Sequence, residues 1–140
     1  MRPGRLSVFP AFHKVAGRPV LVVGDGPEAA AKVRLLGETE AVIRLVAPAP
    51  TPELSALLMQ AGVHHVARPF RPEDLDGAVL VFAASGVRDS DAEVVAAARA
   101  RSIPANAVDI PELCDFYTPA IVNRAPVAVA ISIELTFTLR

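Results

Sequence analysis

The chain has one cysteine, Cys114, and therefore no internal disulfide. A single unpaired thiol is typical of proteins from a reducing cytoplasm. No apolar run reaches the roughly 18 to 20 residues of a membrane-spanning helix, because Arg, Asp, Glu or Pro interrupts each one. The first twelve residues include Arg2 and Arg5 but no long apolar stretch, so we expect no signal peptide. These absences predict a cytoplasmic protein that does not span a membrane.

An excess of one charge is also absent, since 14 basic and 15 acidic residues give a formal net charge of −1. This balance gives no support for a nucleic-acid partner or a membrane surface. The adjacent His64 and His65 fall on a predicted strand and point to opposite faces, so they cannot hold one metal ion together. Cys114 has no histidine or cysteine partner at zinc-site spacing. We therefore expect no metal site formed by the protein.

What is present is a chain of 140 residues that is 52% hydrophobic and 21% charged, which is enough to form one domain with a buried core. Short apolar runs alternate with helical patterns, as in βαβ units. The pattern predicts an α/β fold, a Rossmann-type doubly wound parallel sheet of about five strands with a short C-terminal β extension. The expected strands are 19–23, 41–46, 63–67, 78–84 and 105–108. The expected helices are 27–36, 52–61 and one that Asp89 or Ser90 caps and that ends at Arg101, with a helical turn at 71–75.

The C-terminal region has a different pattern. Residues 110–117 indicate a loop, and strands are expected at 121–122 and 127–132 around a turn at 123–126. Residues 134–140 alternate apolar and polar side chains, as in an amphipathic strand that could pair across a dimer interface. We therefore expect residues 1–140 to form a single NAD-binding domain. Residues 119–140 would carry the dimerisation strands of a homodimer.

The sharpest local motif is the G-x-G-x-x-A sequence of residues 24–29. It follows a predicted strand and opens a predicted helix, which is the context of a dinucleotide-binding loop. Gly24 permits the tight turn, Gly26 lets the backbone approach a pyrophosphate, and the helix N-terminus favours its negative charge. A strand-to-helix turn without a ligand needs glycine in the same way. Asp25 adds a carboxylate beside the phosphate path, and no acidic residue ends the second strand, so the motif does not choose between NAD and NADP.

Several segments together resemble one family. These are FPAFHKVAGRPVLVVG, VLVVGDGPEAAAKVRLL, RLVAPAPTPEL, LVFAAS and, most specific, NAVDIPELCDFYTPAIVNR within ANAVDIPELCDFYTPAIVNRAPVAVAIS. From about Phe9 to Ser132 the chain resembles the precorrin-2 dehydrogenase / sirohydrochlorin ferrochelatase family, the N-terminal module of siroheme synthase. It departs from the family at Asp25 and Ala31, where the family has glycine and arginine, while Lys32 is retained. It also lacks the Gly-Gly turn and the helical domain that follow the last strand in the family.

The resemblance implies an NAD-dependent oxidation of precorrin-2 to sirohydrochlorin in siroheme biosynthesis, with Fe²⁺ insertion in some members. It implies that the glycine loop, Gly24, Asp25, Gly26 and Pro27, holds the cofactor diphosphate. The segment Val46, Ala47 and Pro48 would lie near the adenosine ribose, and the strand end at Ala84 and Ser85 would lie against the nicotinamide. In this family the aspartate of the NAVD motif, here Asp109, is tied to both dehydrogenation and chelation.

Asp109 also makes sense from its predicted position, at the carboxyl end of a parallel strand, where open α/β sheets bind ligands. A carboxylate there can take the proton that a reduced tetrapyrrole loses with its hydride; the alternative is that Asp109 only caps the next turn. Asn106, Asn123 and Arg124 are candidates for binding substrate carboxylates, although each could serve its own loop or solvent instead. The competing functions are a non-catalytic module that senses NAD(H), a tetrapyrrole or a metal, and a nucleotide-gated transporter subunit.

Overall fold

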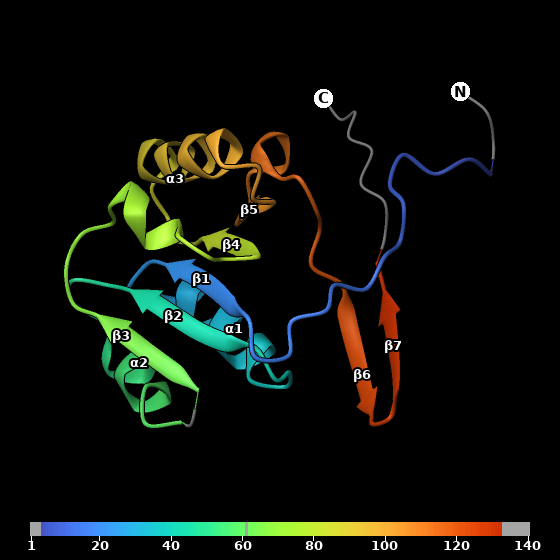
Figure 1. Ribbon diagram of the computed structural model, residues 1–140, viewed down its shortest axis with the longest axis horizontal. Helices are drawn as coiled ribbons and strands as arrows, with labels where there is room; N and C mark the ends of the chain where they lie inside the picture. The colour runs from blue at the N-terminus through green and yellow to red at the C-terminus, as the bar shows by residue number, and fades with distance from the viewer. Residues whose placement is uncertain (1–3, 61, 133–140) are drawn as a thin grey trace.

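The computed structural model describes residues 4–60 and 62–132. Five parallel strands form one sheet in the order β3-β2-β1-β4-β5, and two antiparallel strands form a separate hairpin (Figure 1). The sheet strands are β1 (Pro19–Val23), β2 (Val42–Val46), β3 (Val63–Val66), β4 (Leu80–Ala83) and β5 (Ala105–Ala107). The helices are α1 (Pro27–Leu36), α2 (Pro52–Leu57) and α3 (Arg88–Ala100), with 3-10 turns η1 (Pro72–Leu75) and η2 (Pro111–Leu113). This arrangement confirms the predicted Rossmann-type fold.

Strands β1 and β4 are apolar on both faces because helices cover both sides of the sheet. Val20 and Val22 of β1 pack with α1 and α2 on one face, together with Phe82 of β4. Leu21 and Val23 point the other way and pack with α3. Val20 lies between Ile43 of β2 and Leu80 of β4 in the parallel register, all of them buried. Strand β1 is therefore the centre of the core.

Two of the three helices, α1 and α2, begin where the sequence predicts. Pro27 begins α1 in the first turn, where its missing N–H is harmless, and the Oγ1 of Thr51 accepts a bond from the N–H of Leu54 at the start of α2. The predicted cap of α3 at Asp89 or Ser90 is wrong, because the helix begins at Arg88 after Val87, which makes no side-chain cap. A hydrogen-bonded turn of Ser85 starts the helix earlier than the sequence indicates.

Helix α2 is also shorter than predicted and ends at Leu57 instead of residue 61. The chain continues through tight turns, in which the N–H groups of Leu58 and Gln60 donate to the carbonyls of Ser55 and Leu57. Gly62 follows with φ of +86°, a conformation that favours glycine, and the chain then turns into β3. The apolar spacing alone does not reveal this tightening.

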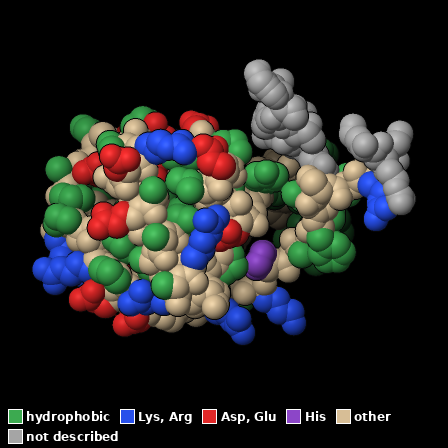
Figure 2. Space-filling model, turned by 90° about the horizontal axis from the view of Figure 1, so that it is seen from above, with side chains coloured by type: hydrophobic (Ala, Val, Ile, Leu, Met, Phe, Trp, Pro, Cys, Tyr) green, Lys and Arg blue, Asp and Glu red, His purple; other side chains and the backbone are tan. Residues whose placement is uncertain are grey.

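The hairpin β6 (Ala120–Arg124) and β7 (Val127–Ile131) lies apart from the sheet (Figure 1). Strand β6 extends the predicted strand at 121–122 at both ends, so the predicted turn at 123–126 is too long and only residues 125–126 form it, because Asn123 and Arg124 pair with β7. The segment before β1 lies at the same end of the molecule as the hairpin (Figures 1 and 2). The predicted amphipathic strand at residues 134–140 lies outside the described residues. No helix in the described ranges is long and apolar enough to cross a membrane.

Candidate functional site

The topological switch point of this sheet lies between the neighbouring strands β1 and β4. Strand β1 leads into α1 on one face and β4 leads into α3 on the other, so the two connections diverge at the carboxyl ends of the strands. Open α/β sheets bind ligands at such a switch point. The predicted cofactor residues lie here, in the loops after β1, β2 and β4. We call this group, residues 24–27, 46–48 and 84–85, the cradle.

Gly24 is packed against the end of β4 so closely that no side chain fits. A Cβ added to Gly24 would lie 2.1 Å from the carbonyl oxygen of Ala84 and 2.6 Å from its carbonyl carbon. The N–H of Gly24 donates to the carbonyl of Val46 at 3.1 Å, and the N–H of Ala84 donates to the carbonyl of Val23 at 2.8 Å. Backbone hydrogen bonds therefore join the three predicted segments of the cradle at Gly24.

Gly26 has the opposite surroundings, since a Cβ there would meet only the Oε1 of Glu28, at 3.8 Å. Gly26 is the N-cap of α1, and the space where a side chain would lie contains no closer protein atom. The helix N-terminus behind it presents free N–H groups and a partial positive charge, which suit a diphosphate. The carboxylate of Glu28 already lies at this end of the helix, near both Gly26 and Gly86. The open space at Gly26 and the helix end fit a dinucleotide.

The side chain of Asp25 has a hydrogen-bond partner in the next loop. Its Oδ2 accepts a hydrogen bond from the N–H of Ala49 at 3.3 Å, and its backbone carbonyl accepts one from the N–H of Thr51 at 2.9 Å. Asp25 therefore ties the glycine loop to the loop after β2, which includes the fully buried Ala47 and the exposed Pro48. The carboxylate serves as a structural acceptor on the side of the cradle that follows β2.

Ser85 is held by a buried acid that the sequence analysis did not single out. Asp91, in the first turn of α3, is 1% exposed, and its Oδ1 accepts hydrogen bonds from the N–H and the Oγ of Ser85 at 3.0 and 2.7 Å. The Ser85 hydroxyl also faces the backbone of Val87. This pair fixes the loop after β4, so Ser85 presents mainly backbone to the switch point.

Beside the cradle, a hollow of about 570 Å³ opens at the end of β5. Asp109 lines it from the turn after β5, in the left-handed region with φ of +64°. Aspartate tolerates this conformation better than most residues, and such conformations cluster at functional sites. The N–H of Val108 donates to the carbonyl of Ala83 at 3.0 Å, which joins the Asp109 turn to the strand end beside Ser85. The exposed carboxylate thus lies on the cradle's side of the sheet edge.

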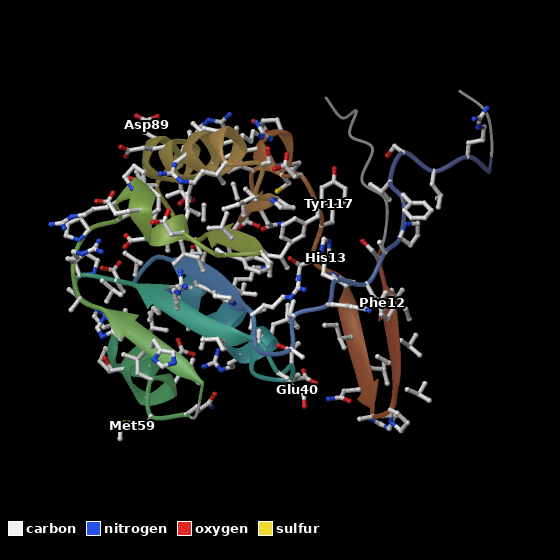
Figure 3. The ribbon with its side chains drawn as sticks, in the orientation of Figure 1. Phe12, His13, Glu40, Met59, Asp89 and Tyr117 are labelled. Atoms are coloured by element: carbon white, nitrogen blue, oxygen red, sulfur yellow. The ribbon has the colours of Figure 1, made fainter. Side chains whose placement is uncertain are left out.

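Lys32 and Cys114 line the same hollow. Burial lowers the pKa of the Lys32 ammonium below its usual value, while the negative charge of Asp109, and that of Cys114 when it is a thiolate, act in the opposite direction. Burial raises the pKa of the Cys114 thiol, which donates to the carbonyl of Ala107 at 3.2 Å. Tyr117 lines the hollow as well, and Figure 3 places it between the sheet and the hairpin. The hollow therefore combines one cation, one carboxylate and a neutral thiol.

A family described as "Putative NAD(P)-binding" matches residues 11–120 of the chain. The chain belongs to this NAD(P)-binding family. The match confirms the predicted nicotinamide cofactor, and it covers the cradle and Asp109 together. The predicted resemblance to the siroheme synthase family is confirmed by the relatives that follow.

The chain is 44% identical over 127 residues to siroheme synthase of Methylobacillus flagellatus and 42% identical to that of Thioalkalivibrio sulfidiphilus. These alignments cover 91% of this chain but only 27% and 26% of the two relatives, so the chain spans about a quarter of their length. Among solved structures, SirC, a precorrin-2 dehydrogenase, is similar with a TM-score of 0.72 at 21% identity. That match covers 91% of this chain and 62% of SirC, and it shows a shared fold.

Within this NAD(P)-binding domain, the three predicted substrate residues have different positions. Asn106 is 5% exposed, and its Nδ2 donates to the carbonyl of Phe116 at 2.8 Å, so its amide anchors the following loop at the wall of the hollow. Asn123 accepts a bond from the N–H of Ala125, and Arg124 donates to the carbonyl of Asn123. Both lie at the turn of the hairpin, whereas its other end, at Ile131, lines the hollow.

The sequence patterns predict no role for Lys32 or Asp91. A signal for Lys32 exists, because it is one of two lysines among 14 basic residues and follows the buried Ala29 by three positions in α1. For Asp91 no such signal exists, because a spacing of six residues from Ser85 does not by itself predict a contact. Over residues 4–60 and 62–132, no group of three His, Cys, Asp or Glu side chains could hold a metal ion.

Proposed function

We propose that this chain oxidises precorrin-2 to sirohydrochlorin with NAD⁺ in siroheme biosynthesis, in the cytoplasm. The observation that carries the proposal is the position of Asp109, which lines a hollow at the end of β5, where the N–H of Val108 donates to the carbonyl of Ala83 at the end of β4. The siroheme synthase relatives and the precorrin-2 dehydrogenase with the same fold support the choice of substrate. The hollow supplies room, a carboxylate and a cation for a reduced tetrapyrrole that carries carboxylates.

The reaction removes one hydride and one proton from the tetrapyrrole. NAD⁺, when bound, accepts the hydride at its nicotinamide ring. The backbone around Gly24 and Gly26 would hold its diphosphate, and the loop after β4, which Asp91 fixes through Ser85, would hold its nicotinamide half. The ionised carboxylate of Asp109 accepts the proton, so that a new double bond forms as the two hydrogens leave. Positioning the two groups at one sheet edge makes the step effectively intramolecular.

Fe²⁺ enters the proposal only as a substrate. Metal insertion into sirohydrochlorin displaces pyrrole N–H protons, and Asp109 is the carboxylate in the hollow that can accept them. The same preparations therefore test chelation by the absorbance change of sirohydrochlorin on Fe²⁺ addition.

We also propose that two copies associate through the hairpin. Its apolar side chains are unusually exposed, with Val127 at 60% and Ile131 at 61%, and Phe12 of the nearby N-terminal segment is 70% exposed. Contiguous exposed apolar surface of this kind marks protein–protein contacts. Sedimentation equilibrium should show a dimer at micromolar concentration, and Val127→Asp should weaken it. A wild-type monomer across the whole range would contradict this part of the proposal.

The deciding experiment is anaerobic conversion of freshly generated precorrin-2, followed by absorbance, with NAD⁺ and NADP⁺ in parallel. Asp109→Asn keeps a residue that tolerates the left-handed conformation while it removes the charged base. We expect turnover to fall about 10²- to 10⁴-fold with NAD⁺ binding retained. Asp89→Asn is the matched control, since Asp89 is exposed on α3 and does not line the hollow (Figure 3). Equal turnover in Asp109→Asn would overturn the assigned role, and NAD⁺ binding without any wild-type turnover would favour the sensor function.

A further inference from the structure

Lys32 is a cation at the wall of the hollow, and it has no carboxylate partner at ion-pair distance in the part of the chain that the structure describes. Its side chain extends from α1, where Nζ donates to the Oγ1 of Thr118 at 3.3 Å and lies 5.6 Å from the centre of the Phe82 ring. Within the described ranges, no acidic oxygen approaches Nζ to ion-pair distance, although five other basic side chains form ion pairs. The ammonium has three donors, and Thr118 accepts only one of them.

This arrangement is costly for the free protein. A half-buried charge loses part of its hydration, and one neutral hydroxyl and an aromatic face replace only some of it. The lowered pKa of Lys32 has the same cause, since burial disfavours the charged form. Asp109 and Cys114 favour the charged form without touching it. An anion bound in the hollow would relieve this cost.

We propose that Lys32 binds a peripheral carboxylate of the tetrapyrrole and so holds the ring in the hollow within reach of Asp109. The inference rests on the proposed function and deepens it, because it names the residue that recognises the acidic substrate. Lys32 is a positioning residue here, and the proton moves to Asp109. A carboxylate on Nζ forms charge-assisted hydrogen bonds, and these are stronger beside a half-buried ammonium than in bulk water.

The dinucleotide phosphate is another anion that could reach a lysine on α1. The lining of the hollow argues for the substrate instead, because Lys32 shares it with Asn106, Asp109 and Tyr117 and with none of the glycine-loop residues. Lys32 also lies in the second turn of α1, beyond the helix end where Gly26 receives the diphosphate. The experiments below therefore include both ligands.

The first experiment measures the binding of uroporphyrin, a stable tetrapyrrole with many carboxylates, to wild type, Lys32→Gln, Lys32→Arg and Lys14→Gln. Lys14 is the matched control, since it is the other lysine of the chain and is exposed. We expect Lys32→Gln to weaken uroporphyrin binding and raise KM for precorrin-2 by roughly 10- to 100-fold, the range for a hydrogen bond to a charged group. Lys32→Arg should restore part of the affinity, and Lys14→Gln should change nothing. NAD⁺ affinity, measured by calorimetry, should be unchanged in all four proteins, which also shows that they fold.

The second experiment needs no substitution in the protein under test. Reductive methylation with ¹³C-formaldehyde labels Lys14 and Lys32, and the signal that is absent from Lys32→Arg is assigned to Lys32. In free protein we expect the pKa of Lys32 to lie below its usual value, because burial disfavours the charged form. Uroporphyrin should raise the titration midpoint of Lys32 and shift its signal, while NAD⁺ should leave both unchanged.

The outcomes separate this inference from the proposed function. Unchanged KM and uroporphyrin affinity in Lys32→Gln, with normal wild-type turnover, would overturn the inference and leave the dehydrogenase standing. A Lys32 signal that responds to NAD⁺ and not to uroporphyrin would also overturn it and assign the cation to the cofactor phosphate. A Lys32 response to uroporphyrin in a protein without turnover would support the anion site and reject the dehydrogenase.

Discussion

The cradle and the hollow open at the same edge of the sheet, but they are built from different parts of the chain. In the cradle, backbone groups make the contacts, and the side chains of Asp25, Ser85 and Asp91 are engaged with that backbone. In the hollow, Lys32 and Asp109 carry opposite charges that face open space, and neither forms an ion pair within the described residues. The cradle is therefore shaped by the backbone of the fold, whereas the hollow presents charged side chains that the fold does not use.

This difference predicts two kinds of mutational response. A substitution in the cradle must disturb the ends of buried strands, so it should change the stability of the fold together with cofactor affinity. A substitution in the hollow removes a group that the fold does not need, so it should change substrate binding or turnover while stability stays within about 0.5 kcal/mol. The predictions below test this separation.

The largest effect is expected for Gly24→Ala. The added methyl would lie 2.1 Å from the Ala84 carbonyl oxygen, so β1 and β4 would have to separate at their carboxyl ends. We expect the free energy of unfolding to fall by about 3 kcal/mol, with cofactor binding lost. Denaturant titration and calorimetry with NAD⁺ measure the two quantities.

Gly26→Ala is the matched control, because a Cβ there meets no backbone. We expect it to cost about 1 kcal/mol of stability or less, and to weaken NAD⁺ binding because the methyl enters the diphosphate space. Equal losses of stability in the two variants would contradict the division between packing at Gly24 and ligand approach at Gly26.

The next effect concerns Asp91, whose loss would leave the N–H and hydroxyl of Ser85 without their buried acceptor. We expect Asp91→Ala to lower the free energy of unfolding by about 2 kcal/mol and to weaken NAD⁺ binding. Asp91→Asn keeps an acceptor oxygen and should cost less. Asp89→Ala, two residues earlier and exposed, should be almost neutral in the same denaturant titration. An Asp91→Ala protein as stable as wild type would show that the loop after β4 keeps its conformation without this acceptor.

The fold and the cradle were predictable because their signals are local. The apolar run of β1, the glycines after it and Pro27 lie within nine consecutive residues, and each acts through backbone geometry that does not depend on distant partners. The premature end of α2 and the start of α3 were not predictable in this way. They depend on turn hydrogen bonds and on the contact of Asp91 with Ser85, which short-range propensities do not contain.

The hollow was predictable only in part, through the resemblance that points to Asp109. Its charge arrangement needs Lys32 from α1, Asp109 from the end of β5 and Thr118 from the loop beyond η2 to meet in space. No spacing in the sequence encodes a contact between residues 32 and 118. The same holds for Asn123 and Arg124, whose position at the far end of the hairpin follows from strand register.

A smaller effect should mark the thiol of the hollow. Burial raises the pKa of Cys114, so less of it is thiolate at pH 8.5 than for an exposed cysteine. We expect alkylation by iodoacetamide at that pH to be several-fold slower in the native protein than in urea, and the native rate to keep rising as pH increases further. Mass spectrometry of quenched samples gives both rates. Equal rates in the native and unfolded protein would contradict the burial of the thiol in this wall.

The smallest effect is expected at Asp25, where the cradle carries its own negative charge. Asp25→Asn keeps an acceptor for the N–H of Ala49, so the loop should stay in place while a charge near the diphosphate is removed. We expect NAD⁺ to bind about three- to tenfold more tightly at low salt, because like charges several ångströms apart repel by about 1 kcal/mol at an intermediate effective dielectric. The gain should shrink at high salt, where screening weakens this repulsion.

Glu40→Gln serves as the control, because Glu40 is an exposed acid before the amino end of β2 (Figure 3). It should leave the affinity for NAD⁺ unchanged. A dissociation constant for NAD⁺ that Asp25→Asn leaves unchanged at every salt concentration would contradict this repulsion. The Asp25 carboxylate would then only hold the loop, and its charge would have no effect on cofactor binding.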